Sequence, residues 1–371
     1  MQRTAFLLKS GRKERLASGA ADGPTEFFFG YPQLRDSGAD VDLWQDNDFG
    51  LDKSPPWLWR AVNHIAWTLL GLPLWATYRL ARRDARAILQ RYDAVVVTTN
   101  TFGISLALLN RLGLCKPRLI FVAMGLVDTK TPKRIILFYR VLLHHIALLS
   151  LGRPEVAFLK DQLPGAQIGY LPFGVDSRFW KPTEPTPATL PDARYVLSIG
   201  NDRHRDYTTL LLAWKPDYPQ LKIVTNQQIP ATSIPANVTV ISGDWHRQLL
   251  SDERIRNLMQ GALFVVLPIL DTIQPSGQSA CLQAMACGKA VILSDIRGIW
   301  DRDLIRDNDN CLLVPPGSVA DLQASIEHSL GNPAACARRG AMARQTVERE
   351  LNIDVLYARV AQHINADTAS S

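Results

Sequence analysis

The sequence predicts an α/β protein built from two domains, and three observations support this prediction. The first is a strand–helix–strand pattern over residues 263–295, where apolar runs at Leu263–Ile269 and Ala290–Leu293 flank a helical segment. The second is a proline-rich connector, Lys181–Pro191, with further short apolar runs on both sides of it. The third is a length of 371 residues, 47% hydrophobic and 20% charged, which accommodates two α/β domains of ordinary size.

The amino-acid composition indicates which kinds of molecule this protein can bind. The net charge of +6 and pI near 9.1 favour anions such as phosphorylated ligands or anionic lipid. We expect no nucleic-acid partner because no nucleic-acid-binding motif is present. The cysteines are odd in number and lack a CxxC pair, which predicts buried free thiols and no zinc site. The first residues, MQRTAFLLKSGRKER, have too short an apolar core for a signal peptide, so we expect a cytoplasmic protein, with possible membrane association on the cytoplasmic face.

The first half of the chain reads as strands of a parallel sheet separated by helices. A basic loop, Ser10–Gly23, follows the first strand, and the acidic run Asp36–Asp52 is most simply a solvated loop. An amphipathic helix is predicted over Ser105–Leu112. The predicted strands are Thr4–Leu8, Ala39–Leu43, Asp93–Thr98, Arg118–Val122 and Ile146–Leu149.

Residues 55–83 hold four of the nine tryptophans and end in a group of arginines. A break at 71–73 and several polar residues argue against a spanning helix, which needs about 20 uninterrupted apolar residues. The pattern fits a pair of helices lying on a membrane surface, and a second basic and apolar stretch at 133–145 fits the same picture. Burial of both stretches in the core is the alternative, and the residues leave the two interpretations open.

The second half repeats the alternation of strands and helices. Helices are predicted over Ser251–Gly261, Val319–Leu330 and Ala334–Ile364. Besides the two strands of the 263–295 unit, the predicted strands are Tyr195–Ile199, Lys222–Thr225 and Val238–Ile241.

The 263–295 unit contains a candidate anion site. Cap-type residues at 275–279 open its helix and Gly288 ends it, which places the helix N-terminus at the carboxyl edge of the sheet. Free backbone N–H groups there, at Gly277, Gln278 and Ser279, attract a negative charge, and the Ser276 and Ser279 hydroxyls add donors. Gln283 lies one turn deeper on the same face. An ordinary βαβ unit with a polar loop fits the local pattern equally well.

The stretch GQSACLQAMACGKAVILSD resembles the donor-site signature of GT-B glycosyltransferases in the glycosyl transferases group 1 (GT4-like) family. IGYLPFGVDSRFW at 168–180 and NDNCLLVP at 308–315 are similar to two further family segments. The resemblance implies two Rossmann-like, doubly wound domains facing across a cleft, with a last helix that crosses back to the first domain. The implied limits are 1–180 for the acceptor domain, 181–191 for the linker, 192–350 for the donor domain, and 351–371 for the crossover helix and tail.

The resemblance also assigns donor-site roles. After the strand at 195–199, Gly200 opens a segment in which Arg203 and Arg205 take the place of cations that grip the donor diphosphate. A solvated basic turn is the alternative. Gln283 would hold the ribose. Trp245 or His246 would stack on the nucleotide base, although surface decoration is nearly as compatible with the sequence.

On the acceptor side the resemblance points to Gly11, Met124 and Gly125. A family histidine is missing at 124–126, and Gln283 stands where the family often has Glu. The implied function is retaining transfer from a nucleotide-diphosphate sugar to a glycan, lipid-linked or small-molecule acceptor. We expect it to need no metal or cofactor, and we read Asp301 and Asp303 as a loop charge cluster. The alternatives are a non-catalytic subunit that binds a nucleotide sugar and a nucleotide-sugar epimerase, although no acid–base carboxylate pair is visible for the latter.

Overall fold

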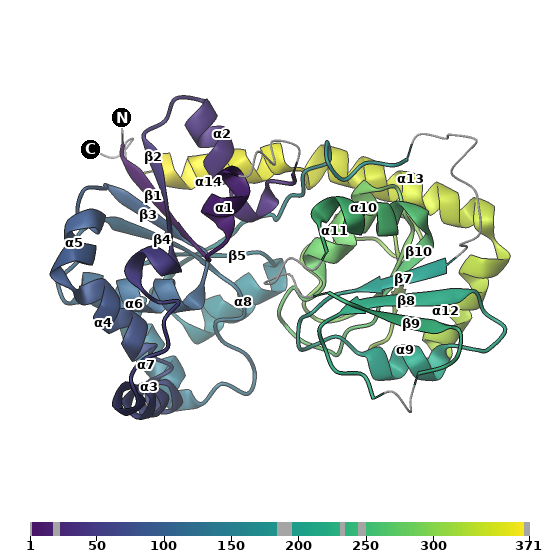
Figure 1. Cartoon of the computed structure of the whole chain (residues 1–371), viewed down its shortest axis with the longest axis horizontal. Coiled ribbons are helices and arrows are strands. Elements are labelled where there is room, and N and C mark those ends of the chain that lie inside the picture. Colours follow the sequence, from purple (N-terminus) through teal and green to yellow (C-terminus); the bar gives the residue numbers. More distant parts are fainter. Residues whose placement is uncertain (1, 18–22, 184–194, 231–233, 244–249, 367–371) are drawn as a thin grey trace. The chain divides into compact units, whose positions relative to one another are not determined.

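The computed structural model describes residues 2–17, 23–183, 195–230, 234–243 and 250–366 (Figure 1). The chain forms two compact units. Unit 1 comprises Met1–Ala21, Phe27–Pro172 and Leu356–Ser371, and unit 2 comprises Asp22–Glu26 and Phe173–Val355. Each unit therefore contains a segment from the opposite end of the chain. The predicted linker 181–191 lies largely outside the described residues.

Unit 1 is built on a six-stranded, fully parallel sheet. Its order is β2-β1-β3-β4-β5-β6, so β1 and β3 are neighbours from which the chain proceeds in opposite directions. The five predicted strands are confirmed, and the sixth was missed because Ile168 is the one fully buried position in it. The strands are β1 (Thr4–Leu8), β2 (Val41–Gln45), β3 (Ala94–Val97), β4 (Arg118–Ala123), β5 (Ala147–Ser150) and β6 (Gln167–Tyr170).

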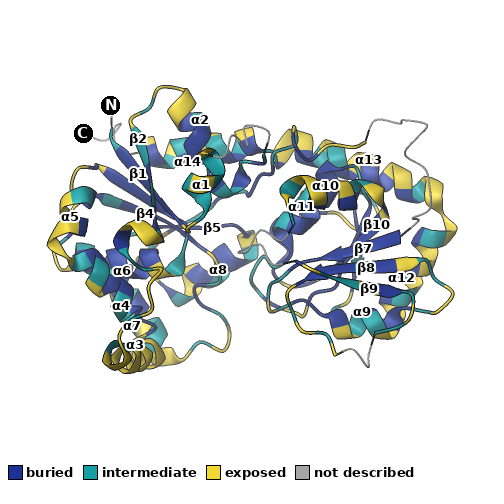
Figure 2. Cartoon of the chain, viewed as in Figure 1, coloured by how far each residue is buried: buried dark blue, intermediate teal, exposed yellow. Residues whose placement is uncertain are grey.

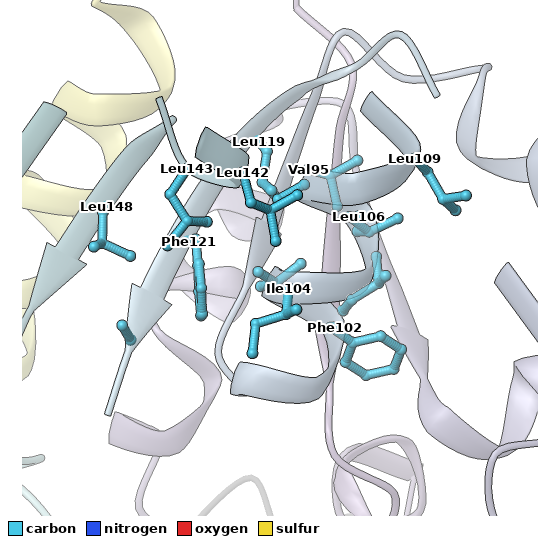
Figure 3. Packing of buried hydrophobic residues seen from close by; sticks show 14 of the residues in the cluster. Val95, Phe102, Ile104, Leu106, Leu109, Leu119, Phe121, Leu142, Leu143 and Leu148 are labelled. Atoms are coloured by element: carbon cyan, nitrogen blue, oxygen red, sulfur yellow. The ribbon is translucent and has the colours of Figure 1, made fainter. Parts of the chain in front are cut away.

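Apolar side chains from helices pack on this sheet to form the core of unit 1. Phe102 and Ile104 of one helix, α6, lie in the same cluster as Phe121 of β4 and Leu142 of α7 (Figure 3). Burial of each such side chain contributes about 1.5–3 kcal/mol. The helices are α1 (Arg12–Ala17), α2 (Tyr31–Asp36), α3 (Trp57–Leu70), α4 (Leu74–Ala81), α5 (Arg83–Leu89), α6 (Asn100–Arg111), α7 (Lys133–Leu142) and α8 (Arg153–Gln162).

Two predicted loops in unit 1 are wrong. Part of the basic loop forms α1, because the Gln45 side chain accepts hydrogen bonds from the first backbone N–H groups, those of Arg12 (2.6 Å) and Lys13 (2.8 Å). In the acidic run, the part that follows the predicted strand forms a 3₁₀ turn, Asp46–Phe49, rather than a solvated loop. Its carboxylates have local partners: Asp48 pairs with Lys13, and Asp46 accepts from the Ser10 backbone. Charges that look solvent-directed in the sequence therefore join α1 and the residue Ser10 before it to the 3₁₀ turn that follows β2.

The helix pair predicted over 55–83 is confirmed as α3 and α4, separated by Gly71. Burial in the core is wrong for α3, in which no residue is buried, whereas α4 buries Ala76, Thr77 and Leu80 (Figure 2). Over the described ranges, no helix combines the length and apolarity needed to cross a bilayer.

Unit 2 contains a second six-stranded parallel sheet, in the order β12-β11-β10-β7-β8-β9. The chain runs from β7 outward to β9, then returns to β10 and runs outward on the other side. The direction therefore reverses between β7 and β10, where open α/β sheets bind ligands. The strands are β7 (Tyr195–Ile199), β8 (Gln220–Thr225), β9 (Val238–Ser242), β10 (Ala262–Leu267), β11 (Val291–Ser294) and β12 (Leu312–Val314).

Side-chain caps start most helices of unit 2 where the sequence places Ser or Asp. Asp206 accepts from the Thr209 N–H at the start of α9, and Ser251 and Ser318 do the same for α10 and α12. Gly288, at φ 72°, follows the end of α11, as predicted. The helices are α9 (Tyr207–Ala213), α10 (Asp252–Gly261), α11 (Gln278–Ala286), α12 (Val319–Gly331) and α13 (Pro333–Glu350).

The predicted C-terminal helix is divided into α13 and α14 (Ile353–Asn365). From Leu356 onward the chain belongs to unit 1, which agrees with the expected return of the last helix. There Arg118 of β4 donates hydrogen bonds to the carbonyls of His363 (2.9 Å) and Ile364, so α14 has its last carbonyls satisfied by a cation.

Candidate functional site

The candidate donor site lies in unit 2, at the carboxyl ends of β7 and β10. The loop after β7 carries Gly200 and Arg205, and the loop after β10 leads to Gly277 and α11. Backbone contacts tie the loops together: the Leu270 N–H donates to the His204 carbonyl (2.8 Å), and Arg205 forms a bridge with Ile269. Residues about 70 positions apart in sequence are therefore held at one point of the sheet edge.

Gly200 makes room for the Arg205 side chain. Its φ is 153°, and a Cβ atom there would lie 2.1 Å from Nε of Arg205. The Gly200 carbonyl is fixed by hydrogen bonds from the Tyr207 hydroxyl (2.7 Å) and the Thr225 hydroxyl (2.8 Å). Because the backbone cannot easily move away, any larger residue at 200 would displace the guanidinium.

Arg205 is a buried cation whose hydrogen-bonding capacity is only partly used. The residue is 7% exposed, and Nε lies 2.8 Å from a carboxylate oxygen of Asp202. Within the described part of the chain, Nη1 has no hydrogen-bond partner. A buried donor without a partner is unfavourable by about 1–3 kcal/mol, so the site favours an anion that accepts from Nη1.

The N-terminus of α11 lies beside this guanidinium. Gly277, at φ 77°, precedes the helix, and a Cβ atom on it would lie 3.3 Å from Nη1 of Arg205 and 2.4 Å from Cδ1 of Ile269. Glycine is therefore required both by the backbone conformation and by the close approach. The positive end of α11 and a buried cation converge, which is an arrangement suited to a phosphate or diphosphate.

The other predicted donor residues are distributed around this centre. The Ser276 hydroxyl lies 3.1 Å from Nδ1 of His204, Gln278 is buried and Ser279 is half-buried. Arg203 is exposed, so the structure distinguishes it from the buried Arg205, although both were predicted to grip the diphosphate. Trp245 and His246 lie outside the described residues.

Asn201, next to Gly200, holds neighbouring loops together. Its amide donates to the Gly243 carbonyl (2.5 Å) and its oxygen accepts from the Asn226 N–H (2.7 Å). These bonds connect the segments that follow β7, β8 and β9. Next to them a hollow of about 440 Å³ has Arg205, Tyr207, Gln227 and Ile229 in its wall.

Gln283 is joined to a buried carboxylate that the sequence analysis missed. Its amide nitrogen donates to Glu26 (3.0 Å), which also accepts from the Trp180 indole (2.8 Å) and from the Asp176 N–H (3.3 Å). Glu26 is 0% exposed, and burial raises its pKa, opposed by the hydrogen bond from Gln283. The only signal in the sequence was a lone acid at the start of the aromatic run TEFFFGY.

The acceptor-side candidates lie in unit 1, where loops follow β1 and β4. Gly11 has a φ of 91° and open space around its Cβ position. Met124 is 46% exposed, and its backbone is held on both sides by the Asn100 side chain, whose amide donates to the Met124 carbonyl (3.0 Å). The Gly125 N–H donates to the buried Glu155 (3.0 Å), a second carboxylate that the sequence analysis missed.

Glu155 is a titratable group beneath this loop. Its second oxygen accepts from the Ser150 hydroxyl (2.5 Å), and burial raises its pKa to about 7 despite the two hydrogen bonds. No sequence pattern distinguishes Glu155, which stands among the first residues of α8 like an ordinary acid near a helix N-terminus.

We expect Glu155→Gln to remove a pH-dependent part of the stability of unit 1. The folded-state pKa of about 7 exceeds the ordinary value of 4.5, so folding favours the protonated form. The stabilisation is fully present below the ordinary pKa and is lost as the pH rises toward about 7. At about 1.4 kcal/mol per pKa unit, the wild-type protein loses on the order of 3 kcal/mol over this interval. Urea unfolding at a series of pH values measures the loss.

The matched control is Asp52→Asn, which removes an exposed acid of the same unit. Its pH profile should follow the wild-type profile. Wild-type and Glu155→Gln curves that run parallel between the ordinary and the raised pKa would show that Glu155 does not titrate in this range.

The described residues contain no group of three or more His, Cys, Asp or Glu side chains placed to hold a metal ion. Asp301, from the predicted charge cluster, is 1% exposed and accepts from the Asp303 N–H (3.1 Å). All five cysteines are buried free thiols, as predicted.

Comparisons with known proteins give matches in sequence and in fold. Residues 221–332 match the family described as Glycosyl transferases group 1. The alpha-maltose-1-phosphate synthase of Mycolicibacterium smegmatis is 26% identical over 196 residues, 46% of this chain and 47% of that protein. The matched region thus spans about half the length of that curated relative.

Two solved structures are similar over the whole chain. Sucrose-phosphate synthase from Thermosynechococcus elongatus has a TM-score of 0.75 at 18% identity, covering 100% of both chains. Anabaena HepE, solved in complex with UDP-glucose, has a TM-score of 0.69 at 13% identity, covering 99% of this chain and 100% of the other. At these identities the likeness establishes the fold.

Proposed function

We propose that this protein transfers a sugar from a nucleotide-diphosphate sugar to an acceptor hydroxyl. The match of residues 221–332 to the Glycosyl transferases group 1 family and the GT-B fold of the whole chain support this proposal. The observation that carries the proposal is the buried Arg205 guanidinium, with Nη1 unpaired among the described residues, beside Gly277 at the start of α11. HepE, a neighbour in fold, was solved with UDP-glucose, which supports a nucleotide sugar as the donor.

In the proposed reaction the donor diphosphate lies against Arg205 and the N–H groups that begin α11. The bond between the anomeric carbon and the diphosphate oxygen breaks, and negative charge develops on the departing nucleotide. Arg205 and the α11 N-terminus stabilise that charge without requiring a metal ion. Arg203, exposed on the same turn, and the Ser276 hydroxyl add secondary contacts.

The acceptor oxygen attacks from the face that the leaving group vacates, so the anomeric configuration is retained. The acceptor hydroxyl proton passes to the departing phosphate, which balances the step. A glycan or a lipid-linked alcohol is the acceptor class we propose, contacted from unit 1 by the loops that carry Gly11, Met124 and Gly125. Exposed Met124 and the open space at Gly11 support this assignment.

A nucleotide-sugar-binding subunit without catalysis is the second candidate. The observation in its favour is that the Gln283 amide is engaged with Glu26, at the position where the resembling family often has a Glu. Held in this way, Gln283 still has an amide oxygen with which to accept from a ribose hydroxyl.

A panel of sugar nucleotides tests both candidates. Protection against thermal unfolding should appear with at least one of UDP-, GDP- or ADP-glucose, because a ligand at about 100 times its Kd adds about 2.7 kcal/mol of stability. Incubation of that donor with glycan acceptors and with lipid-linked sugar acceptors, both of which offer hydroxyl groups, should then yield product. Protection without transfer or donor hydrolysis supports the binding subunit, and no protection by any donor contradicts both candidates.

A further inference from the structure

Helix α3 presents an apolar face to solvent. Trp57 is 79% exposed, and Leu58, Val62, Ile65 and Leu69 are all exposed along one stripe of the helix. A surface helix of a globular protein normally turns its polar side outward, so this pattern is inverted. In Figure 2, α3 is drawn mostly in the colour of exposed residues.

This helix is nevertheless held firmly in unit 1. Its inner side packs on α4, where Trp59 lies 4.6 Å from Tyr78 and 5.5 Å from Trp75, measured between ring centroids. At its end Arg134 of α7 donates to the carbonyls of Thr68 and Leu69. The exposed stripe is therefore a fixed surface and not a frayed segment.

Helix α7, which contacts α3, extends the same surface. Leu137 and Val141 are exposed, and Lys133 lies one turn before Leu137 on the same side. Together, the exposed apolar residues of α3 and α7 define what we call the α3/α7 face.

Neither α3 nor α7 carries an acidic side chain. Residues 53–83 and 129–153, which contain both helices, include no Asp or Glu. Their cations are Lys53, Arg60, Arg79, Arg82, Arg83, Lys130, Lys133, Arg134, Arg140 and Arg153. An apolar strip that contains tryptophan, on helices whose charged side chains are all cations, is complementary to an anionic lipid surface, where indoles enter the headgroup region and cations meet phosphates.

We propose that the α3/α7 face docks unit 1 onto an anionic lipid bilayer, with α3 lying in the plane of the interface. The fourteen residues of α3 have an axial length of about 21 Å, too short to span the hydrocarbon core but suited to lying along it. This inference rests on the surface alone and does not depend on the donor or on transfer.

The test is co-sedimentation of the purified chain with vesicles of phosphatidylcholine alone or mixed with phosphatidylglycerol. The wild-type protein should bind the mixed vesicles at least about tenfold more tightly than the neutral ones, and added salt should weaken the binding. The affinity of the double variant Trp57→Ser/Ile65→Ser for the mixed vesicles should be lower than that of the wild type by at least about tenfold, because two exposed apolar anchors are removed. Arg60→Glu/Lys133→Glu should lose the preference for anionic lipid.

Leu112→Ser is the matched control, since Leu112 is equally exposed (60%) but follows α6. It should bind vesicles like the wild type, and all variants should keep the wild-type melting temperature. Equal binding by the double variant would overturn the proposal, as would absence of binding to any vesicle. A wild-type dimer that Trp57→Ser/Ile65→Ser makes monomeric, without vesicle binding, would assign the face to a second copy instead. Donor protection remains measurable in every variant, so failure here is separable from failure of the transferase.

Discussion

Arg205→Ala is expected to lower the rate of sugar transfer by about 10²–10³-fold, the loss seen when a preorganised donor to a developing oxyanion is removed. Arg205 is 7% exposed and its Nη1 lies beside Gly277, so no mobile surface cation can replace it. Protection against thermal unfolding by the donor should fall in parallel. Arg205→Lys should retain only part of the wild-type activity. An ammonium group lacks the planar arrangement of N–H donors with which a guanidinium donates two parallel hydrogen bonds to a diphosphate. Initial rates and melting curves with the protective nucleotide sugar measure these effects.

The control is Arg338→Ala, which removes an exposed arginine from α13 of the same unit. Its rate should remain within about twofold of the wild type, as is usual for surface changes of small energetic effect. The transfer rate of Arg203→Ala should lie between those of Arg205→Ala and Arg338→Ala, since Arg203 is exposed on the loop that carries Arg205. Unchanged turnover and unchanged donor protection in a folded Arg205→Ala protein would refute the assignment of the diphosphate to this residue.

Glu26→Ala is expected to have the largest effect on stability. It removes the acceptor of the Trp180 indole N–H, of the Gln283 amide and of the Asp176 N–H, all within unit 2. Trp180 is 1% exposed, so its N–H would remain buried without a partner. We expect unit 2 to lose roughly 3 kcal/mol or more, since each unsatisfied buried group costs about 1–3 kcal/mol. Urea unfolding followed by tryptophan fluorescence gives the value.

The variant Glu26→Gln separates the contribution of the hydrogen bonds to stability from the effect of removing side-chain volume. Its amide oxygen can still accept from Trp180 and Gln283, so the loss should be less than half of that for alanine. Glu350→Ala, an exposed acid at the end of α13, should change the free energy of unfolding by less than about 0.5 kcal/mol. Equal unfolding midpoints for Glu26→Ala and the wild type would mean that the Glu26 contacts add nothing to stability.

Much of the fold was predictable because the signals are local. Short Val- and Ile-rich runs mark buried parallel strands, and a Pro-Ser-Gly start with a Gly end marks α11. Arg205 was predicted as a donor-site residue because the segment that directly follows β7 resembles a family segment. Glu26 was not, because Trp180 and Gln283 are 154 and 257 residues away in the sequence. Likewise, the apolar pattern of α3 predicts a helix, but it does not predict which of its apolar residues stay exposed to solvent.

The exchange of end segments between the units also bears on how the chain is made. Unit 1 is completed only by Leu356–Ser371. When the first 180 residues of a nascent chain have emerged from the ribosome, α14 is still missing. The carbonyl groups of α14 that accept hydrogen bonds from Arg118 of β4 are then missing too. Domains generally fold as units during synthesis, the N-terminal one first, but here unit 1 is complete only once the segment that forms α14 has been synthesised. Until then, unit 1 lacks the side chains of Leu356, Val360 and Ile364, which are buried in the folded chain.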